Sequence, residues 1–80
     1  MNEQIYIGMA KMQIEAGDVQ NALTILTSAL KQYPDSAQLH IERGRIYRTL
    51  GNNEAALFDL KKAAELNPQL INISTLAKLD

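Results

Sequence analysis

Two stretches of the chain carry the same pattern of apolar and polar positions, 34 residues apart. The first, "GDVQNALTILTSALKQYP", begins at Gly17, and the second, "GNNEAALFDLKKAAELNP", begins at Gly51. In both, small and large apolar residues follow the glycine at steps of three and four, and a proline ends the run, which predicts an amphipathic helix. The identical pairs at this offset are Gln4/Gln38, Ile7/Ile41, Gly17/Gly51, Ala22/Ala56, Leu23/Leu57, Leu26/Leu60, Ala29/Ala63 and Pro34/Pro68.

Start and stop signals divide most of the chain into four helices. Asp18, Ser36 and Asn52 are good N-capping residues for three of them. Each glycine can take the left-handed backbone conformation that ends a helix, and each proline prevents its continuation. The predicted helices cover approximately residues 2–16, 18–33, 36–49 and 52–67. They form two helical pairs, and repeated alanines on the second helix of each pair let a neighbouring helix approach closely.

The last ten residues, "INISTLAKLD", are too short for a third pair. Their leucines and isoleucine have the spacing of one apolar helix face, which would cover the end of the second pair. We therefore expect a capping helix at about residues 69–79 and an all-α fold with five helices.

The residues at the repeated positions resemble the tetratricopeptide repeat. In the second unit the resemblance is carried by His40, Gly44, Tyr47, Gly51, Ala56, Leu60, Ala63 and Pro68, and in the first by Tyr6, Ala10, Gly17, Ala22, Leu26, Ala29 and Pro34. The departures are His40 in place of a large aromatic residue, Arg43 in place of leucine and Gln13 in place of tyrosine. The resemblance implies a right-handed α-solenoid within a single domain, residues 1–80, with repeats at about 3–36 and 37–70.

The resemblance also implies a function. Tetratricopeptide repeats usually hold a peptide or a helix of a partner protein in a concave groove lined by the first helix of each unit. The stripe that would face this groove offers amides, cations and apolar side chains, which fit an acidic partner segment. Its members are Gln4, Ile7, Lys11 and Ile14 in the first unit, and Gln38, Ile41, Arg45 and Arg48 in the second. Solvated surface charge is the simpler interpretation of the same cations.

Self-association is the alternative function. Repeat folds usually need about three units for a stable core, and two units leave an apolar edge on the first helix. Ile5, Met9 and Met12 lie on that edge and could pair with a second copy. The chain could also be an excerpt of a longer repeat array that acts as a scaffold.

Composition narrows the remaining possibilities. The chain has 80 residues, 8 Lys and Arg against 9 Asp and Glu, and no cysteine. This balance does not favour nucleic acid, and thiolate chemistry is excluded. Glu3 and Lys11 interrupt any signal peptide, and the apolar runs are too short for a membrane span, so we expect a cytoplasmic protein.

No constellation of residues indicates an enzyme, a metal, a cofactor or a small-molecule substrate. The single histidine, His40, is interpreted as a packing residue, and Asp59 and Glu65 as solvated charges on the outer face of the last repeated helix. Arg43 stands at a nominally packed position. We expect its head group to reach solvent, with an ion pair to Asp59 or Glu54 as the other possibility.

Overall fold

The structure is a computed structural model that describes residues 2–70. In chain order it contains α1 (Glu3–Glu15), α2 (Val19–Gln32), α3 (Ala37–Thr49), α4 (Asn53–Leu66) and a short 3₁₀ turn, η1 (Pro68–Leu70). The described residues thus contain four α-helices rather than the five expected. The predicted capping helix falls almost entirely on residues 71–80, outside the described part of the chain, and its first residues belong to η1.

The helix starts follow the predicted capping residues. The Asp18 carboxylate accepts a hydrogen bond from the backbone N–H of Asn21 at 3.0 Å. The Ser36 hydroxyl accepts one from Leu39, and the Asn52 amide oxygen accepts one from Ala55, both at 3.2 Å. Each bond satisfies a helix N–H that has no partner within the helix, and such a cap typically contributes about 1 kcal/mol.

The two turns inside the helical pairs depend on glycine. Gly17 and Gly51 have φ angles of 86° and 83°, in the left-handed region that residues with a side chain rarely adopt. After Gly17, the backbone N–H of Asp18 donates a 2.8 Å hydrogen bond to the carbonyl oxygen of Gln13. After Gly51, the N–H of Asn52 donates one of the same length to Tyr47, so both helix ends have a carbonyl satisfied by the turn. The repeated glycine therefore produces the same tight turn twice.

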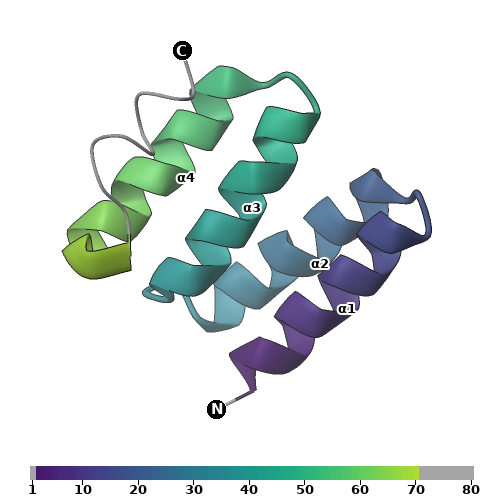
Figure 1. The fold of residues 1–80 in the computed structure, drawn as a ribbon. Helices are drawn as coiled ribbons and strands as arrows, with labels where there is room; N and C mark the ends of the chain where they lie inside the picture. The colour runs from purple at the N-terminus through teal and green to yellow at the C-terminus, as the bar shows by residue number, and fades with distance from the viewer. Residues whose placement is uncertain (1, 71–80) are drawn as a thin grey trace.

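The helices form two stacked antiparallel hairpins (Figure 1). α1 packs on α2, α3 packs on α4, and α2 packs on α3, while α1 and α3 also touch directly. The largest core lies between the hairpins and takes side chains from α1, α2 and α3. Its buried members are Ile7, Ala10, Ala22, Leu26, Ala29, Leu30, Leu39 and Ile46. Because α3 completes this core, neither hairpin buries its apolar surface alone.

In the second hairpin, Gly44 of α3 lies against α4. A Cβ atom at this position would lie 3.2 Å from the Ala56 carbonyl oxygen and 3.2 Å from Cγ of Leu60. Ala10 occupies the equivalent place in the first hairpin and is also buried. The small residues at these positions thus set the distance between the two helices of each hairpin.

The outer edge of α1 differs from its counterpart in α3. Leu39 and Ile46 are 0% and 3% exposed because they pack into the first hairpin. The residues 34 positions earlier, Ile5 and Met12, are 59% and 67% exposed. The structure thus exposes the apolar side chains of Ile5 and Met12 on α1, as the sequence predicted.

Candidate functional site

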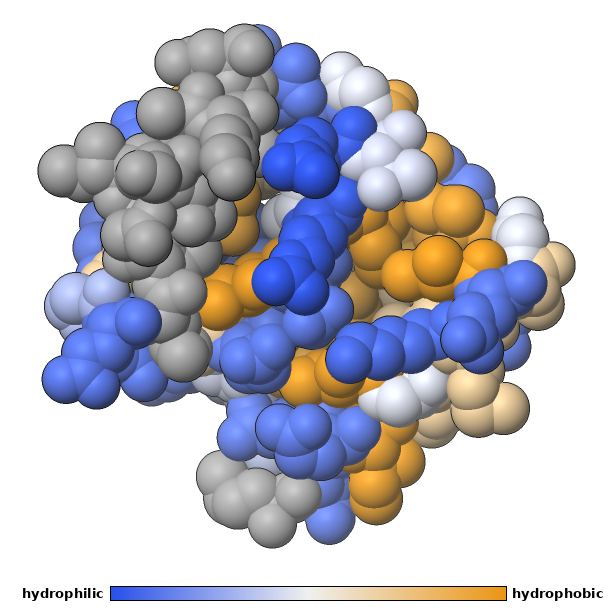
Figure 2. Space-filling view, viewed as in Figure 1, coloured by the Kyte–Doolittle hydropathy of each residue, from blue (hydrophilic) through white to orange (hydrophobic). Residues whose placement is uncertain are grey.

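The groove predicted from the sequence would lie on the face shared by α1 and α3, and three of its residues are cations. Lys11 on α1 and both Arg45 and Arg48 on α3 are exposed. Figure 2, viewed as Figure 1, shows hydrophilic side chains crossing this face with apolar surface between them. Gln4 and Ile14 are also exposed, so five of the eight predicted groove residues are exposed.

The two isoleucines of the predicted groove are placed differently from the expectation. Ile7 belongs to the core between the hairpins, and Ile41 packs against Leu60 and Ala63 of α4. Both side chains are buried, with 5% and 6% of their surface exposed. The open apolar floor that the sequence led us to expect is therefore not provided by this pair.

Gln38, the eighth predicted residue, is half-buried and belongs to a small polar cluster on α3. Its amide Nε2 donates a 2.9 Å hydrogen bond to Oε2 of Glu42. Nη1 of Arg45 lies 3.6 Å from the same carboxylate oxygen. Glu42 was not recognised from the sequence, although its spacing of four residues from Gln38 and three from Arg45 is the spacing at which helix side chains meet.

A buried ionic network joins α3 to α4. The guanidinium of Arg43 donates two hydrogen bonds of 2.8 Å to Asp59, from Nε to Oδ2 and from Nη2 to Oδ1. Asp59 is 0% exposed, which corrects the prediction that it is a solvated charge on the outer face. Of the two possibilities for Arg43, the ion pair with Asp59 is the observed one. A fully buried carboxylate requires such a partner, because leaving it unpaired would cost several kcal/mol.

The network also controls the protonation of Arg43. Hydrogen bonding to Asp59 raises the pKa of the guanidinium, its burial works in the opposite direction, and the negative charge of Asp59 adds to the increase. The guanidinium carbon also lies 5.7 Å from the centre of the Tyr47 ring, within the range of a cation–π interaction. Arg43 therefore stays charged and held in place.

His40 connects this network to the turn between the hairpins. Its Nδ1 lies 3.1 Å from Oδ1 of Asp59, and its Nε2 lies 3.0 Å from the backbone carbonyl oxygen of Pro34. The ring is buried, so both nitrogens are engaged by groups of the protein itself. The histidine is a packing residue, as predicted, but it packs through polar contacts, and neither nitrogen is directed at an external ligand.

The first hairpin has apolar residues at all three equivalent positions. Tyr6, Met9 and Ile25 stand 34 residues before His40, Arg43 and Asp59. The second hairpin thus has a histidine, an arginine and an aspartate where the first hairpin has a tyrosine and two apolar residues, within the same backbone arrangement. This comparison is the signal that could have identified Asp59, since a cation and an acid occur together where the other repeat has two apolar residues.

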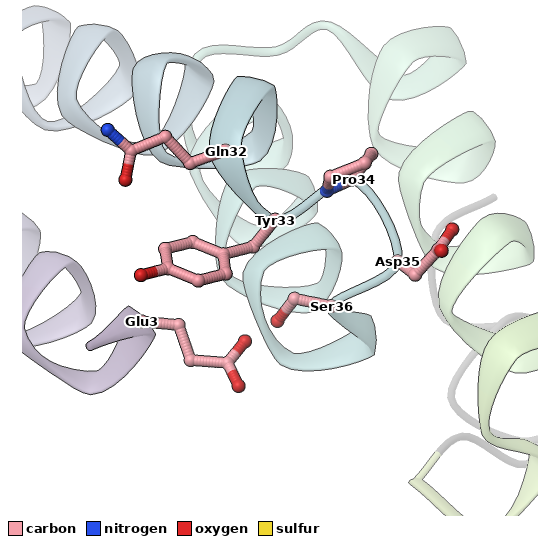
Figure 3. Close-up of a pocket in the computed structure, with 6 residues that line it drawn as sticks. All are labelled: Glu3, Gln32, Tyr33, Pro34, Asp35 and Ser36. Atoms are coloured by element: carbon pink, nitrogen blue, oxygen red, sulfur yellow. The ribbon is translucent and has the colours of Figure 1, made fainter. Parts of the chain in front are cut away.

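A shallow cleft of about 300 Å³ lies where α1, α2 and the start of α3 meet (Figure 3). Figure 3 shows the Tyr33 ring on one side of the cleft and the Glu3 carboxylate on the other, while the Asp35 carboxylate points away. The ring of Tyr33 also contacts Tyr6, with 6.3 Å between ring centres. The residues lining it do not converge on a common point, so the cleft has no built ligand position.

Neither a metal site nor a membrane-spanning helix is found within residues 2–70. No three histidine or carboxylate side chains in this part of the chain come together as metal ligands would. None of the described helices combines the length and apolar character needed to cross a membrane.

Comparison with known proteins agrees with this architecture. The family model described as "Tetratricopeptide repeat" matches residues 13–79. The chain is 49% identical over 51 residues to the Protein SGT1 homolog of Homo sapiens. This alignment covers 64% of this chain and 14% of that protein. The chain is 31% identical over 64 residues to the Protein CTR9 homolog of Arabidopsis thaliana, covering 80% of this chain and 6% of that protein.

A bacterial relative aligns over nearly the whole chain. The Cellulose synthase 2 operon protein C of Komagataeibacter xylinus is 33% identical over 79 residues, covering 94% of this chain and 6% of that protein. The chain thus spans no more than 14% of the length of these three relatives. The family match extends over most of the sequence, and the hairpins, glycine turns and shared core follow the repeat that it describes. The chain belongs to the tetratricopeptide repeat family, a family of protein–protein interaction modules.

Proposed function

We propose that the chain binds an acidic segment of a partner protein, a peptide or a helix, on the face shared by α1 and α3. The observation that carries the proposal is the exposure of Lys11, Arg45 and Arg48 on this one face. Ile14 lies one helical turn after Lys11 on α1 and is 42% exposed, so an apolar contact is available beside this cation. A partner carboxylate and an adjacent apolar side chain would match this arrangement.

An acidic partner would be attracted by local cations and not by the overall charge of the chain. The formal net charge is −1, so overall charge does not attract an acidic partner. Attraction must come from the local cations, and it must weaken as salt screens them, with a Debye length of about 10 Å at 0.1 M ionic strength. Among the described residues, ion pairs form for Arg43 and Arg45 but not for Lys11 or Arg48, which leaves the latter two available.

The test uses a fluorescein-labelled acidic peptide, and fluorescence anisotropy measures its binding to the wild type and to charge variants. Lys11→Gln and Arg48→Gln should each weaken binding about two- to fivefold at low salt, the cost of one exposed charge contact. Lys61→Gln is the matched control, because Lys61 is equally exposed but lies on α4. Equal effects of all three variants would show that binding depends on net charge alone and would contradict the proposal.

A second candidate function is assembly through the open edge of α1. Ile5, Met9 and Met12 are exposed, whereas Leu39 and Ile46 at equivalent positions of α3 pack into a neighbouring hairpin. α3 thus provides an internal template for how α1 would pack against another repeat hairpin. Sedimentation of the wild type and of Met12→Lys from 10 to 500 µM tests it. Concentration-dependent mass in the wild type alone supports assembly, and a monomer throughout rejects it.

A further inference from the structure

The carboxylate of Glu42 contacts two residues of the proposed binding face, Gln38 and Arg45, and none of the functions above uses it. Its side chain is only 12% exposed, whereas that of its partner Arg45 is 68% exposed. It lies on α3 between Leu39 and Ile46, at steps of three and four, and those two residues pack into the first hairpin. Glu42 therefore stands at the seam where α3 meets the first hairpin.

One carboxylate oxygen of Glu42 contacts both Gln38 and Arg45. Oε2 accepts the 2.9 Å hydrogen bond from Gln38 and lies 3.6 Å from Nη1 of Arg45. Gln38 and Arg45 are two of the groups through which an acidic ligand would be recognised. In the free protein they are already turned toward a carboxylate, and that carboxylate is the protein's own.

We infer that Glu42 is an internal competitor for the acidic ligand and thereby determines which partners bind. A partner carboxylate must replace Glu42 at Arg45, or bind beside it against like-charge repulsion. A segment with one isolated acid gains little from this exchange, because one carboxylate contact is lost for each one formed. A segment with several closely spaced acids can also reach Lys11 and Arg48, so Glu42 selects for acidic clusters.

The exchange is energetically feasible because Arg45, the group that a ligand must capture, is the exposed end of the pair. Ion pairs at helix spacings of three or four residues stabilise a protein only slightly, and salt reduces the effect at the exposed end. Removing the Glu42 charge should consequently strengthen binding by about two- to fivefold at low salt. It should also reduce the preference for clustered acids over single ones.

This inference rests on the proposed function, and the experiment separates the two. Two labelled ten-residue peptides are titrated at 50 mM salt, one with four consecutive glutamates and one with a single glutamate in a serine and glycine background. The proteins are the wild type, Glu42→Gln and Glu65→Gln. Glu65 is an exposed acid on α4, so its variant changes the net charge equally at a distance from the site. Thermal melts verify that each variant is folded.

We expect Glu42→Gln to bind both peptides more tightly than the wild type and the single-glutamate peptide to gain more, while Glu65→Gln binds like the wild type. If the wild type binds the clustered peptide but Glu42→Gln gains no more than Glu65→Gln, the competitor role is wrong and the proposed function stands. Absence of wild-type binding to the clustered peptide overturns both. The side-chain amide resonances of Gln38 give an independent readout, since they should shift when Glu42 is replaced by a ligand carboxylate.

Discussion

Arg43 on α3 donates two parallel hydrogen bonds of 2.8 Å to Asp59 on α4, and the carboxylate that accepts them is fully buried. His40 contacts the same carboxylate and also the carbonyl of Pro34. One acidic side chain thus joins both helices of the second hairpin to the turn that precedes it. Such a group must be paired, because a charge inside the protein is tolerated only with its partners in place.

Replacement of Asp59 by alanine should strongly destabilise the protein. The change leaves the half-buried guanidinium of Arg43 without its acceptor and removes the Nδ1 contact of His40. We expect the free energy of unfolding in urea to fall by about 3–5 kcal/mol. Asp35→Ala, in the exposed turn before α3, serves as a control and should change stability by less than about 0.5 kcal/mol. An Asp59 variant as stable as the control would show that the ionic network does not hold the hairpin.

Replacing His40, Arg43 and Asp59 together by the residues of the first hairpin should be far less harmful. The triple variant His40→Tyr, Arg43→Met, Asp59→Ile removes every member of the network together and leaves no buried charge unpaired. We expect its stability to lie within about 1 kcal/mol of the wild type, or above it, whereas Asp59→Ile alone should cost about 3–5 kcal/mol. Additive losses across the three single variants and the triple variant would contradict this coupling.

Two glycines should respond to alanine in opposite directions. At Gly44 the new Cβ would lie 3.2 Å from the Ala56 carbonyl oxygen and from Leu60, so Gly44→Ala should destabilise by about 1–3 kcal/mol. At Gly8, an exposed position inside α1, a Cβ meets nothing within 4 Å. Gly8→Ala should therefore stabilise the protein by about 0.5–1 kcal/mol through improved helix propensity. Thermal melts of the two variants compare them directly, and a loss of stability at Gly8 would be evidence against the described packing of α1.

Most of the fold could be predicted from the sequence because its signals are local and occur twice. Gly17 and Gly51 end helices, three polar residues cap the following ones, and the apolar spacing of three and four defines the buried faces. A second copy of each signal at a fixed offset distinguishes it from chance. The repeat pattern also indicated correctly that α1 keeps an open apolar edge.

The polar contacts were harder to predict because they depend on which side chains meet across helices. Asp59 is separated from Arg43 by 16 residues, and no local pattern reveals that its side chain turns inward. Ile7 and Ile41 were assigned to the open face from their shared spacing with the cations. A stripe at steps of three and four drifts around the helix, however, and its edge can lie in the core, as both isoleucines do here.

Salt dependence provides a test of the proposed site that does not require a variant. An acidic peptide that contacts Lys11, Arg45 and Arg48 should bind about tenfold more weakly at 300 mM than at 50 mM salt, because these exposed charges are screened. A peptide in which glutamines replace the acids is the matched control. Affinity that does not change with salt would indicate that apolar contacts, such as those of Ile14, carry the binding.

The most direct test of the central claim is a titration of the ¹⁵N-labelled protein with a clustered-acid peptide, followed through backbone amide signals. If the face of α1 and α3 is the binding site, the shifts should concentrate at Gln4, Lys11, Gln38, Arg45 and Arg48 and should diminish at high salt. The amide signals of Phe58 and Lys61, exposed residues of α4, should not shift. Shifts concentrated on α4, or no saturable shifts on α1 and α3, would contradict the account.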